Sequence, residues 1–335
     1  MSKSIKKIPF LYKFIGSIIV FLGSFFVAMI FGAADTTIKE VWLAITSTVK
    51  TDTITMIREI RLPREIGAIL VGSALGVSGA IMQGITRNPL ADPSLLGLTS
   101  GANAALALTI ALIPSANYVG IMFSCFVGAA IGAILVIGIS AARKGKLSSF
   151  RIVLAGAAVS AFLYAISEGV GIYFKISKEI SMWSAGGIIG TTWGQIQTIA
   201  PFILIAIFLS ILLSKQLTIL SLSEEVAIGL GQQINFIKYI LFIIVIILAG
   251  SSVALVGNLA FIGLMIPHIV RAIVGTDYRY ILPTTAVVGA TFMLIADTLG
   301  RNMNAPFETP VPAIVAMMGL PFFLFIVRKG GKTLL

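Results

Sequence analysis

Two residues of the chain have the types that nucleophilic catalysis needs. Ser78 lies in Gly76-Val77-Ser78-Gly79, which matches the Gly-x-Ser-Gly pattern of intramembrane serine proteases. His268 is the only histidine and could act as the base that activates the serine. Against this reading, Ser78 stands within a run of small residues in a predicted helix, where a serine usually donates to the preceding turn. We therefore keep a Ser78/His268 protease as an alternative and disfavour it.

Two carboxylates, Glu168 and Asp297, fall inside apolar stretches. A charged group in such a stretch is costly, so each should face a cavity or a partner. A proton-coupled secondary transporter would use groups of this kind. The simpler interpretation is a hydrogen bond between helices or a hydrated position near an interface. Asp297 also stands four residues before Arg301, which predicts an i,i+4 contact if the helix continues.

The composition indicates the elements that must hold these residues. The chain has 335 residues, of which 58% are hydrophobic and 11% charged, and its mean hydropathy is +1.04. Soluble domains carry about 25% charged residues, so the composition predicts an all-α polytopic membrane protein. The single cysteine, Cys125, excludes a disulfide or a cysteine metal site within one chain. We expect no metal and no cofactor.

Apolar runs predict about ten transmembrane helices in a single transmembrane domain spanning residues 1–335. The first run is longer than the apolar core of a signal peptide, so we expect it to be an uncleaved span. The predicted runs are 14–31, 65–84, 95–113, 119–140, 151–173, 197–213, 237–256, 259–275, 281–298 and 312–327. Glycines four apart recur in them, which is typical of closely packed membrane helices. These pairs are Gly72/Gly76, Gly97/Gly101, Gly128/Gly132 and Gly186/Gly190.

The basic residues indicate the orientation. With ten spans and both termini in the cytoplasm, 16 of the 24 lysines and arginines lie inside and 8 outside, as the positive-inside rule requires. The net charge of +11 is therefore a sign of topology and not of nucleic-acid binding. Five of the eight outside charges lie between residues 39 and 64. This local excess, which includes Arg61 and Arg64, requires a separate explanation.

The longest inside segment, 214–236, predicts a short helix with defined ends. Ser223 precedes two glutamates, which is a favourable helix start, and Gly229 and Gly231 follow as a stop. The segment could lie on the lipid surface or dock a cytoplasmic partner. Because it has few lysines and arginines, anionic lipid is the less suitable partner, and we favour docking.

At this point the chain resembles the FecCD-type permeases of bacterial ABC importers, over nearly its whole length. The motifs that carry the resemblance are Arg61-Leu62-Pro63-Arg64, Val77 to Gln83, Asn88-Pro89-Leu90-Ala91-Asp92-Pro93 with Leu96-Gly97, Leu154-Ala155-Gly156, Trp183 and Trp193 around Gly186-Gly187, Phe261 to Arg271, Ala296-Asp297 with Arg301, and Gly319 to Leu324.

The resemblance implies a BtuC-like (type II) ABC importer permease fold in the cytoplasmic membrane. It implies pairing with a second permease subunit, as a homodimer or a paralogous heterodimer. Two copies of a cytoplasmic ATP-binding subunit would dock below, and an extracytoplasmic substrate-binding lipoprotein would dock above. ATP hydrolysis would then occur in the ATP-binding subunit, so we expect the chain to be no enzyme and to have no catalytic residue.

The resemblance also assigns sites, residue by residue. Acidic residues of the binding protein would meet Arg61, Arg64 and Arg301, which would explain the outside basic excess because arginine presents a fork that suits carboxylates. The Asn88–Pro93 turn would be an inner hinge. The ATPase interface would include Glu224, Glu225, Ala227, Gly229 and Gly231. The cytoplasmic gate would be Ser148, Ser149 and Phe150, where many family members have serine in place of Phe150.

The cargo that the resemblance implies is a ferric-siderophore chelate, moved by alternating access. A haem or vitamin B12 importer of the same family stays as an alternative, since no residue identifies the substrate. The proton-coupled transporter also stays open.

Overall fold

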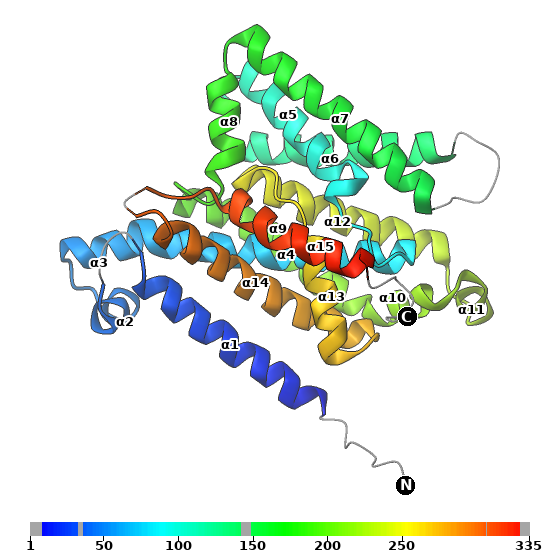
Figure 1. Ribbon diagram of the computed structural model, residues 1–335, viewed down its shortest axis with the longest axis horizontal. Helices are drawn as coiled ribbons and strands as arrows, with labels where there is room; N and C mark the ends of the chain where they lie inside the picture. Colours follow the sequence, from blue (N-terminus) through cyan, green and yellow to red (C-terminus); the bar gives the residue numbers. More distant parts are fainter. Residues whose placement is uncertain (1–8, 33–35, 142–148, 306, 329–335) are drawn as a thin grey trace.

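The computed structural model describes residues 9–32, 36–141, 149–305 and 307–328. Within these ranges the regular structure is helical and no strand occurs. The helices form an elongated bundle in which one group of helices lies to one side (Figure 1).

Ten apolar helices coincide with the ten predicted runs, so the prediction is confirmed for the described residues. Seven are long and apolar enough to cross a membrane, one of them as part of a longer helix that begins at Asp52. Three others are shorter and also apolar. The ten are α1 (Phe10–Ile30), α4 (Leu62–Thr86), α5 (Leu98–Leu112), α6 (Tyr118–Ala141), α7 (Ser149–Phe174), α9 (Trp193–Leu212), α12 (Ile234–Val256), α13 (Ile262–Val274), α14 (Tyr278–Asn302) and α15 (Val311–Arg328).

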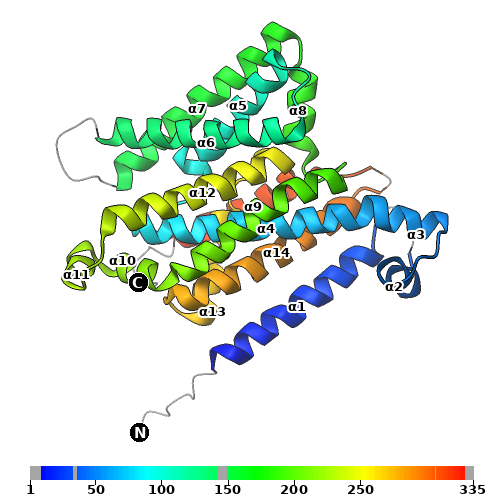
Figure 2. The ribbon, with the colours of Figure 1, turned by 180° about the vertical axis from the view of Figure 1, so that it is seen from behind.

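Short helices mark the two ends of the bundle. One end carries α2 (Ile38–Thr46), α3 (Asp52–Met56), the π-helical turn η1 (Ile57–Arg61) and α8 (Ser177–Gly186). We call it the α2–α3 end. The opposite end carries the 3-10 turn η2 (Ser94–Leu96), α10 (Ser214–Leu222) and α11 (Glu224–Gly229), and we call it the α10–α11 end. Figure 2 shows the same separation from behind.

Helix α4 forms the centre of the bundle and packs directly on α14. A Cβ atom at Gly72 would lie 2.2 Å from the carbonyl oxygen of Gly289, and one at Gly289 would lie 2.2 Å from that of Gly72. The backbones therefore touch, as in the small-residue packing of membrane helices. The Ser73 hydroxyl donates to the Ala286 carbonyl oxygen at 2.9 Å beside this contact.

A second close approach joins α5 to α6, which lie with α7 and α8 on one side of the bundle (Figure 1). Cβ atoms at Gly101 and Gly132 would each lie 2.1 Å from a backbone oxygen, of Gly128 and of Gly97 respectively. Helices α5 and α6 thus pack backbone to backbone through the predicted glycine pairs. The packing interpretation holds for these pairs, whereas Gly190 has open space around its Cβ position.

The loop between α4 and α5 is a set of turns fixed by side chains. Asn88 Oδ1 accepts from the Leu90 amide at 3.0 Å, and Asp92 Oδ1 accepts from the Ser94 amide at 2.7 Å. Burial raises the pKa of the Asp92 carboxyl, against the hydrogen bonds from Ser94. The loop reaches α13, because a Cβ at Gly263 would lie 2.8 Å from Asp92 Oδ2. Its predicted role as a hinge stays a prediction.

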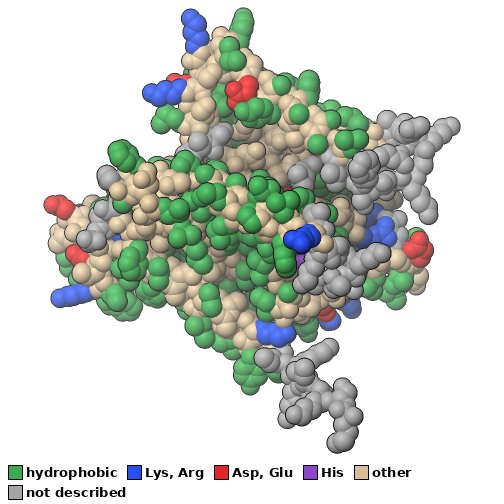
Figure 3. Space-filling view, in the orientation of Figure 1, with side chains coloured by type: hydrophobic (Ala, Val, Ile, Leu, Met, Phe, Trp, Pro, Cys, Tyr) green, Lys and Arg blue, Asp and Glu red, His purple; other side chains and the backbone are tan. Residues whose placement is uncertain are grey.

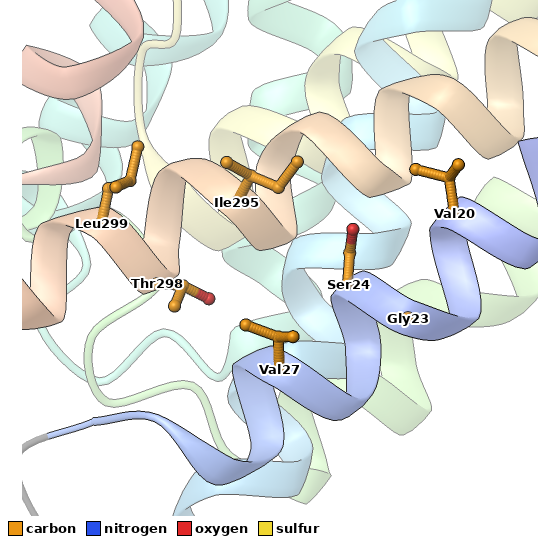
Figure 4. A pocket seen from close by; sticks show the side chains of 7 residues that line it. All are labelled: Val20, Gly23, Ser24, Val27, Ile295, Thr298 and Leu299. Atoms are coloured by element: carbon orange, nitrogen blue, oxygen red, sulfur yellow. The ribbon is translucent and has the colours of Figure 1, made fainter.

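Helix α1 lies at the periphery. It packs against α14 and leaves an apolar groove of about 420 Å³ between the two helices (Figure 4). Apolar side chains are spread over the face in Figure 3, and charged ones gather towards its margins. The residues that line the groove are Val20, Gly23, Ser24, Val27, Ile295, Thr298 and Leu299.

Candidate functional site

The three arginines predicted to act together do lie together at the α2–α3 end. Arg61 ends η1, Arg64 is in the first turn of α4, and Arg301 is in the last turn of α14. A Cβ at Gly32 would lie 2.8 Å from Arg61 Nη2 and 3.4 Å from Arg301 Nη1, so one point of the chain borders two of the guanidinium groups. All three are buried, with exposed fractions of 5%, 8% and 4% in chain order.

Arg64 binds two carboxylates. Its Nη2 donates to Asp297 Oδ1 at 2.8 Å and its Nε to the same oxygen at 3.0 Å. Its Nη1 donates to Glu308 Oε1 at 2.9 Å. Asp297 is fully buried, whereas the side chain of Glu308 is 27% exposed. Arg64 therefore joins a buried carboxylate on α14 to a partly exposed one in the following loop.

Arg301 completes the buried part of the cluster. Its Nη2 donates to Glu65 and, at 3.1 Å, to the Ala28 carbonyl oxygen. Its Nε lies 3.1 Å from Asp297 Oδ2, which confirms the predicted i,i+4 ion pair. Asp297 is thus held between Arg64 and Arg301. The interpretation of Asp297 as a group satisfied within the protein is supported by these contacts.

Arg61 binds backbone and hydroxyl oxygens at the end of α1. Its Nη1 donates to the Met29 carbonyl oxygen and to Thr36 Oγ1, both at 2.6 Å. The guanidinium therefore supplies donors to carbonyl groups that the last turn of a helix leaves unpaired. Arg61 anchors α1 to the cluster.

Sequence reasoning missed Glu65 and Glu308. With Asp297 they supply the carboxylates that pair with the buried guanidinium groups of Arg64 and Arg301. Glu65 could have been found, because a carboxylate at the start of an apolar run needs a partner. Glu308 carried no such signal, since it lies in a loop. We name the set Arg61, Arg64, Glu65, Asp297, Arg301 and Glu308 the charge cluster.

The predicted ATPase-docking helix is present as α11. Ser223 Oγ accepts from the Val226 amide at 3.1 Å and caps the helix, and Gly231 follows it with φ +73°. The predicted start and stop are thus confirmed. Glu225, Gly229 and Gly231 are exposed, while Ala227 is fully buried and packs inside the chain. The helix also presents apolar side chains to the surface, those of Val226 and Ile228 with Leu230 after it.

Helix α10 connects this segment to α14. Thr218 Oγ1 donates to Asp277 Oδ1 at 3.1 Å and accepts from the Tyr278 amide at 2.9 Å. Hydrogen bonds from the Arg279 guanidinium hold the pKa of the Asp277 carboxyl below its usual range. Asp277 is the N-cap of α14 and binds the Arg279 amide. The first turn of α14 is therefore tied to α10 through one hydroxyl.

The other predicted residues fall in different places. Ser148 lies outside the described residues, and Ser149 and Phe150 begin α7 with side chains that also lie outside them. The Ser78 hydroxyl is fully buried and donates to the Leu75 carbonyl oxygen at 3.0 Å, the bond expected of a serine within a helix. The His268 ring packs edge-on against Phe322.

Glu168 differs in exposure from Asp297, the other carboxylate predicted to lie inside an apolar run. It is exposed on α7, and the Tyr164 hydroxyl one turn earlier hydrogen bonds to it. It borders a pocket of about 460 Å³ between α5, α7, α8 and the start of α15. None of the residues that line this pocket belongs to the charge cluster, so the pocket is a separate polar site.

This bundle of apolar helices, with paired charges at one end and a short capped helix at the other, has the fold of an ABC importer permease. The solved structure of a metal-chelate type ABC transporter in an inward-facing conformation matches with a TM-score of 0.80 and 26% identity, over 96% of this chain and 100% of that one. A second solved structure, PsaBC from Streptococcus pneumoniae, matches with a TM-score of 0.62 at 19% identity, over 86% of this chain and 95% of that one, and shows the fold alone.

The family model of the FecCD transport family matches residues 19–329, and the chain belongs to this family. The iron(3+)-hydroxamate import system permease protein FhuB of Bacillus subtilis (strain 168) is 42% identical, over 95% of this chain and 83% of that protein. The Fe(3+)-citrate import system permease protein YfmD of the same organism is 37% identical, over 96% and 95%. The hemin transport system permease protein HmuU of Yersinia pestis is 40% identical, over 81% and 82%.

Proposed function

We propose that the chain passes a ferric-siderophore chelate across the cytoplasmic membrane as the permease of an ATP-driven importer. The observation that carries this proposal is the 42% identity to an iron(3+)-hydroxamate permease over 95% of the chain. Haem is the second candidate cargo, because a hemin permease is 40% identical. Both cargoes are large iron chelates, so the same pathway chemistry would serve either.

In this proposal the α10–α11 end is cytoplasmic and both termini lie on that side. A second permease subunit pairs with the chain, two ATP-binding subunits dock at the α10–α11 end, and a substrate-binding lipoprotein docks at the α2–α3 end. The 16-to-8 distribution of basic residues supports this orientation. The exposed apolar side chains of α11 support a protein partner at the inner end, since a surface of this kind is typical of an interface.

The binding protein would dock over the charge cluster. Exposed apolar side chains of the same end, Trp42, Ile60 and Phe307, would supply the contact area. Arg64 and Arg301 are buried and already bind carboxylates of the chain, of which Glu308 is the partly exposed one. A carboxylate of the binding protein would therefore replace Glu308 on Arg64. Docking and release would then exchange one ion pair for another at little net cost.

Motion of the ATP-binding subunits would reach the bundle through α10. Thr218 ties α10 to the first turn of α14, and the last turn of α14 holds Arg301 in the charge cluster. One helix thus connects the two proposed docking ends. Alternating access would be a shift between two packings of the bundle, with hydrolysis in the partner and no catalytic residue in this chain.

Reconstitution tests the proposal. The permease, its ATP-binding subunits and its binding protein are placed in vesicles, and uptake of a radioactive ferric tris-hydroxamate is measured with and without ATP. We expect uptake that requires ATP and all three components. Uptake of haem but of no ferric siderophore would select the second cargo. Uptake by the permease alone under a proton gradient would overturn the proposal and favour a secondary transporter.

A further inference from the structure

The pocket beside α7 is lined by α5, α7 and α8 and by the start of α15, which is distant from them in the chain. Its volume is about 460 Å³. One wall is α7 with Tyr164 and Glu168, and the other walls come from α5, α8 and the residues that lead into α15. The remaining lining residues are Asn103, Ile180, Ser181, Pro310, Pro312 and Ala313.

Glu168 is an exposed carboxylate in an apolar helix, so its surroundings indicate where water reaches the bundle. Glu168 lies in a helix that is long and apolar enough to span the membrane, and it is exposed. An ionised carboxylate does not face hydrocarbon and requires water or a partner. Glu65 and Asp297 meet that requirement by burial against arginines. Glu168 lines the pocket instead, so the pocket would be part of the aqueous path of the cargo.

The position of Glu168 places the pocket near one mouth of this path. Glu168 is six residues before the last residue of α7, Phe174. At a rise of about 1.5 Å per residue, it lies about 9 Å from the α2–α3 end of the helix. Cargo released by the binding protein at that end would meet this pocket early in its passage.

The charge of the pocket is negative, because its single charged side chain is acidic. Glu168 is the only Asp, Glu, Lys or Arg among the eight residues that line it. Around it stand neutral polar groups, the phenol of Tyr164, the amide of Asn103 and the hydroxyl of Ser181. Such a set accepts hydrogen bonds from N–H groups and attracts a cation, while it repels anions.

We propose that Glu168, positioned by Tyr164, is a cargo-selecting residue at the pathway mouth, favouring ferric chelates whose surface is neutral or cationic and carries N–H donors. Three hydroxamates balance the charge of iron(3+), so a tris-hydroxamate chelate with a pendant ammonium group is cationic. Three catecholates leave a trianion, which the pocket disfavours. The inference rests on the proposed import of ferric chelates and adds the charge class of the cargo.

The test is equilibrium binding to the complete importer in lipid nanodiscs, with uptake as the second readout. The probe is the ferric tris-hydroxamate that carries one ammonium group, and the comparison probe is a ferric tris-catecholate. We expect E168Q to weaken binding of the cationic chelate about tenfold, the size of one charge-assisted hydrogen bond, and to strengthen binding of the trianion. Y164F, which keeps the charge, should give a smaller loss.

E179Q is the matched control, because Glu179 is also exposed, lies on α8 and does not line the pocket. It should leave both chelates unaffected. Equal binding of both probes by the wild type and E168Q would overturn the inference, as would an equal loss for both chelates. Selective binding by the wild type without ATP-driven uptake would uphold the pocket and reject the proposed import. A matching thermal transition in all variants shows that they fold.

Discussion

Arg64 and Asp297 are 233 residues apart in the chain and are joined by a hydrogen bond of 2.8 Å between Nη2 and Oδ1. The pair ties the start of α4 to α14 at the α2–α3 end. It also places an arginine predicted to face a partner against a fully buried carboxylate. The cluster is thus a structural element of the permease.

Asp297→Asn should destabilise the permease strongly. The change leaves Arg64 and Arg301 buried with one carboxylate fewer, and breaking a buried pair costs about 3–5 kcal/mol. We expect a large fall in the thermal transition of the detergent-solubilised protein. Glu308→Gln is the matched control, because Glu308 is 27% exposed and should cost about 1 kcal/mol or less. Equal shifts in the two variants would contradict this account of the cluster.

Glu308→Gln should also strengthen capture of the binding protein. The change replaces the Glu308 carboxylate, which binds Arg64, with a neutral amide. A carboxylate of the binding protein then competes with a weaker internal partner for Arg64. We expect an affinity several-fold higher by surface plasmon resonance, with the difference reduced at high salt. Glu59→Gln removes an exposed carboxylate of η1 and serves as the control. Weaker capture by Glu308→Gln would mean that Glu308 itself contacts the binding protein.

Ile228→Asp should prevent docking of the ATP-binding subunit without unfolding the permease. Ile228 is 66% exposed on α11, so its replacement disturbs no core, while a charge in an apolar interface is costly. Co-purification of the two subunits measures the effect. Ile38→Asp, at a side chain 69% exposed on α2, makes the same change at the other end and should leave co-purification intact.

Thr218→Val should separate ATPase docking from transport. Valine keeps the shape of threonine but removes the hydroxyl that joins α10 to Asp277 and to the Tyr278 amide. We expect the ATP-binding subunits to bind normally, while stimulation of their activity by the loaded binding protein falls several-fold. Thr198→Val, whose hydroxyl bonds only within α9, is the control. Full stimulation in Thr218→Val would rule out this link as the route of coupling.

The sequence determined much of the fold, because membrane helices are defined by runs of apolar residues. All ten spans and the cap of α11 by Ser223 follow from local patterns. The Arg301–Asp297 pair was predictable for the same reason, since the two residues are four apart on one helix. Helix α10 was not predicted, because its residues carry no clear stop or start signal.

The burial of the arginines could not be predicted from charge counts. The positive-inside rule places a residue on one side of the membrane and gives no depth. Asp297 lies 233 residues from its partner Arg64, and Glu65 lies 236 residues from its partner Arg301. Contacts of that separation depend on how α4 packs on α14, which the glycine pattern suggests only in outline.

The touching backbones of Gly72 and Gly289 have a mechanical consequence. Two helices in contact at carbonyl distance cannot slide past each other, because any shift brings a side chain into the space that the glycines leave open. Helices α4 and α14 therefore behave as one rigid unit that runs along the bundle from the α2–α3 end to the α10–α11 end. Any rearrangement of the bundle is then expected between this pair and the helices around it, and the polar pocket lies where α5, α7 and α8 meet the start of α15.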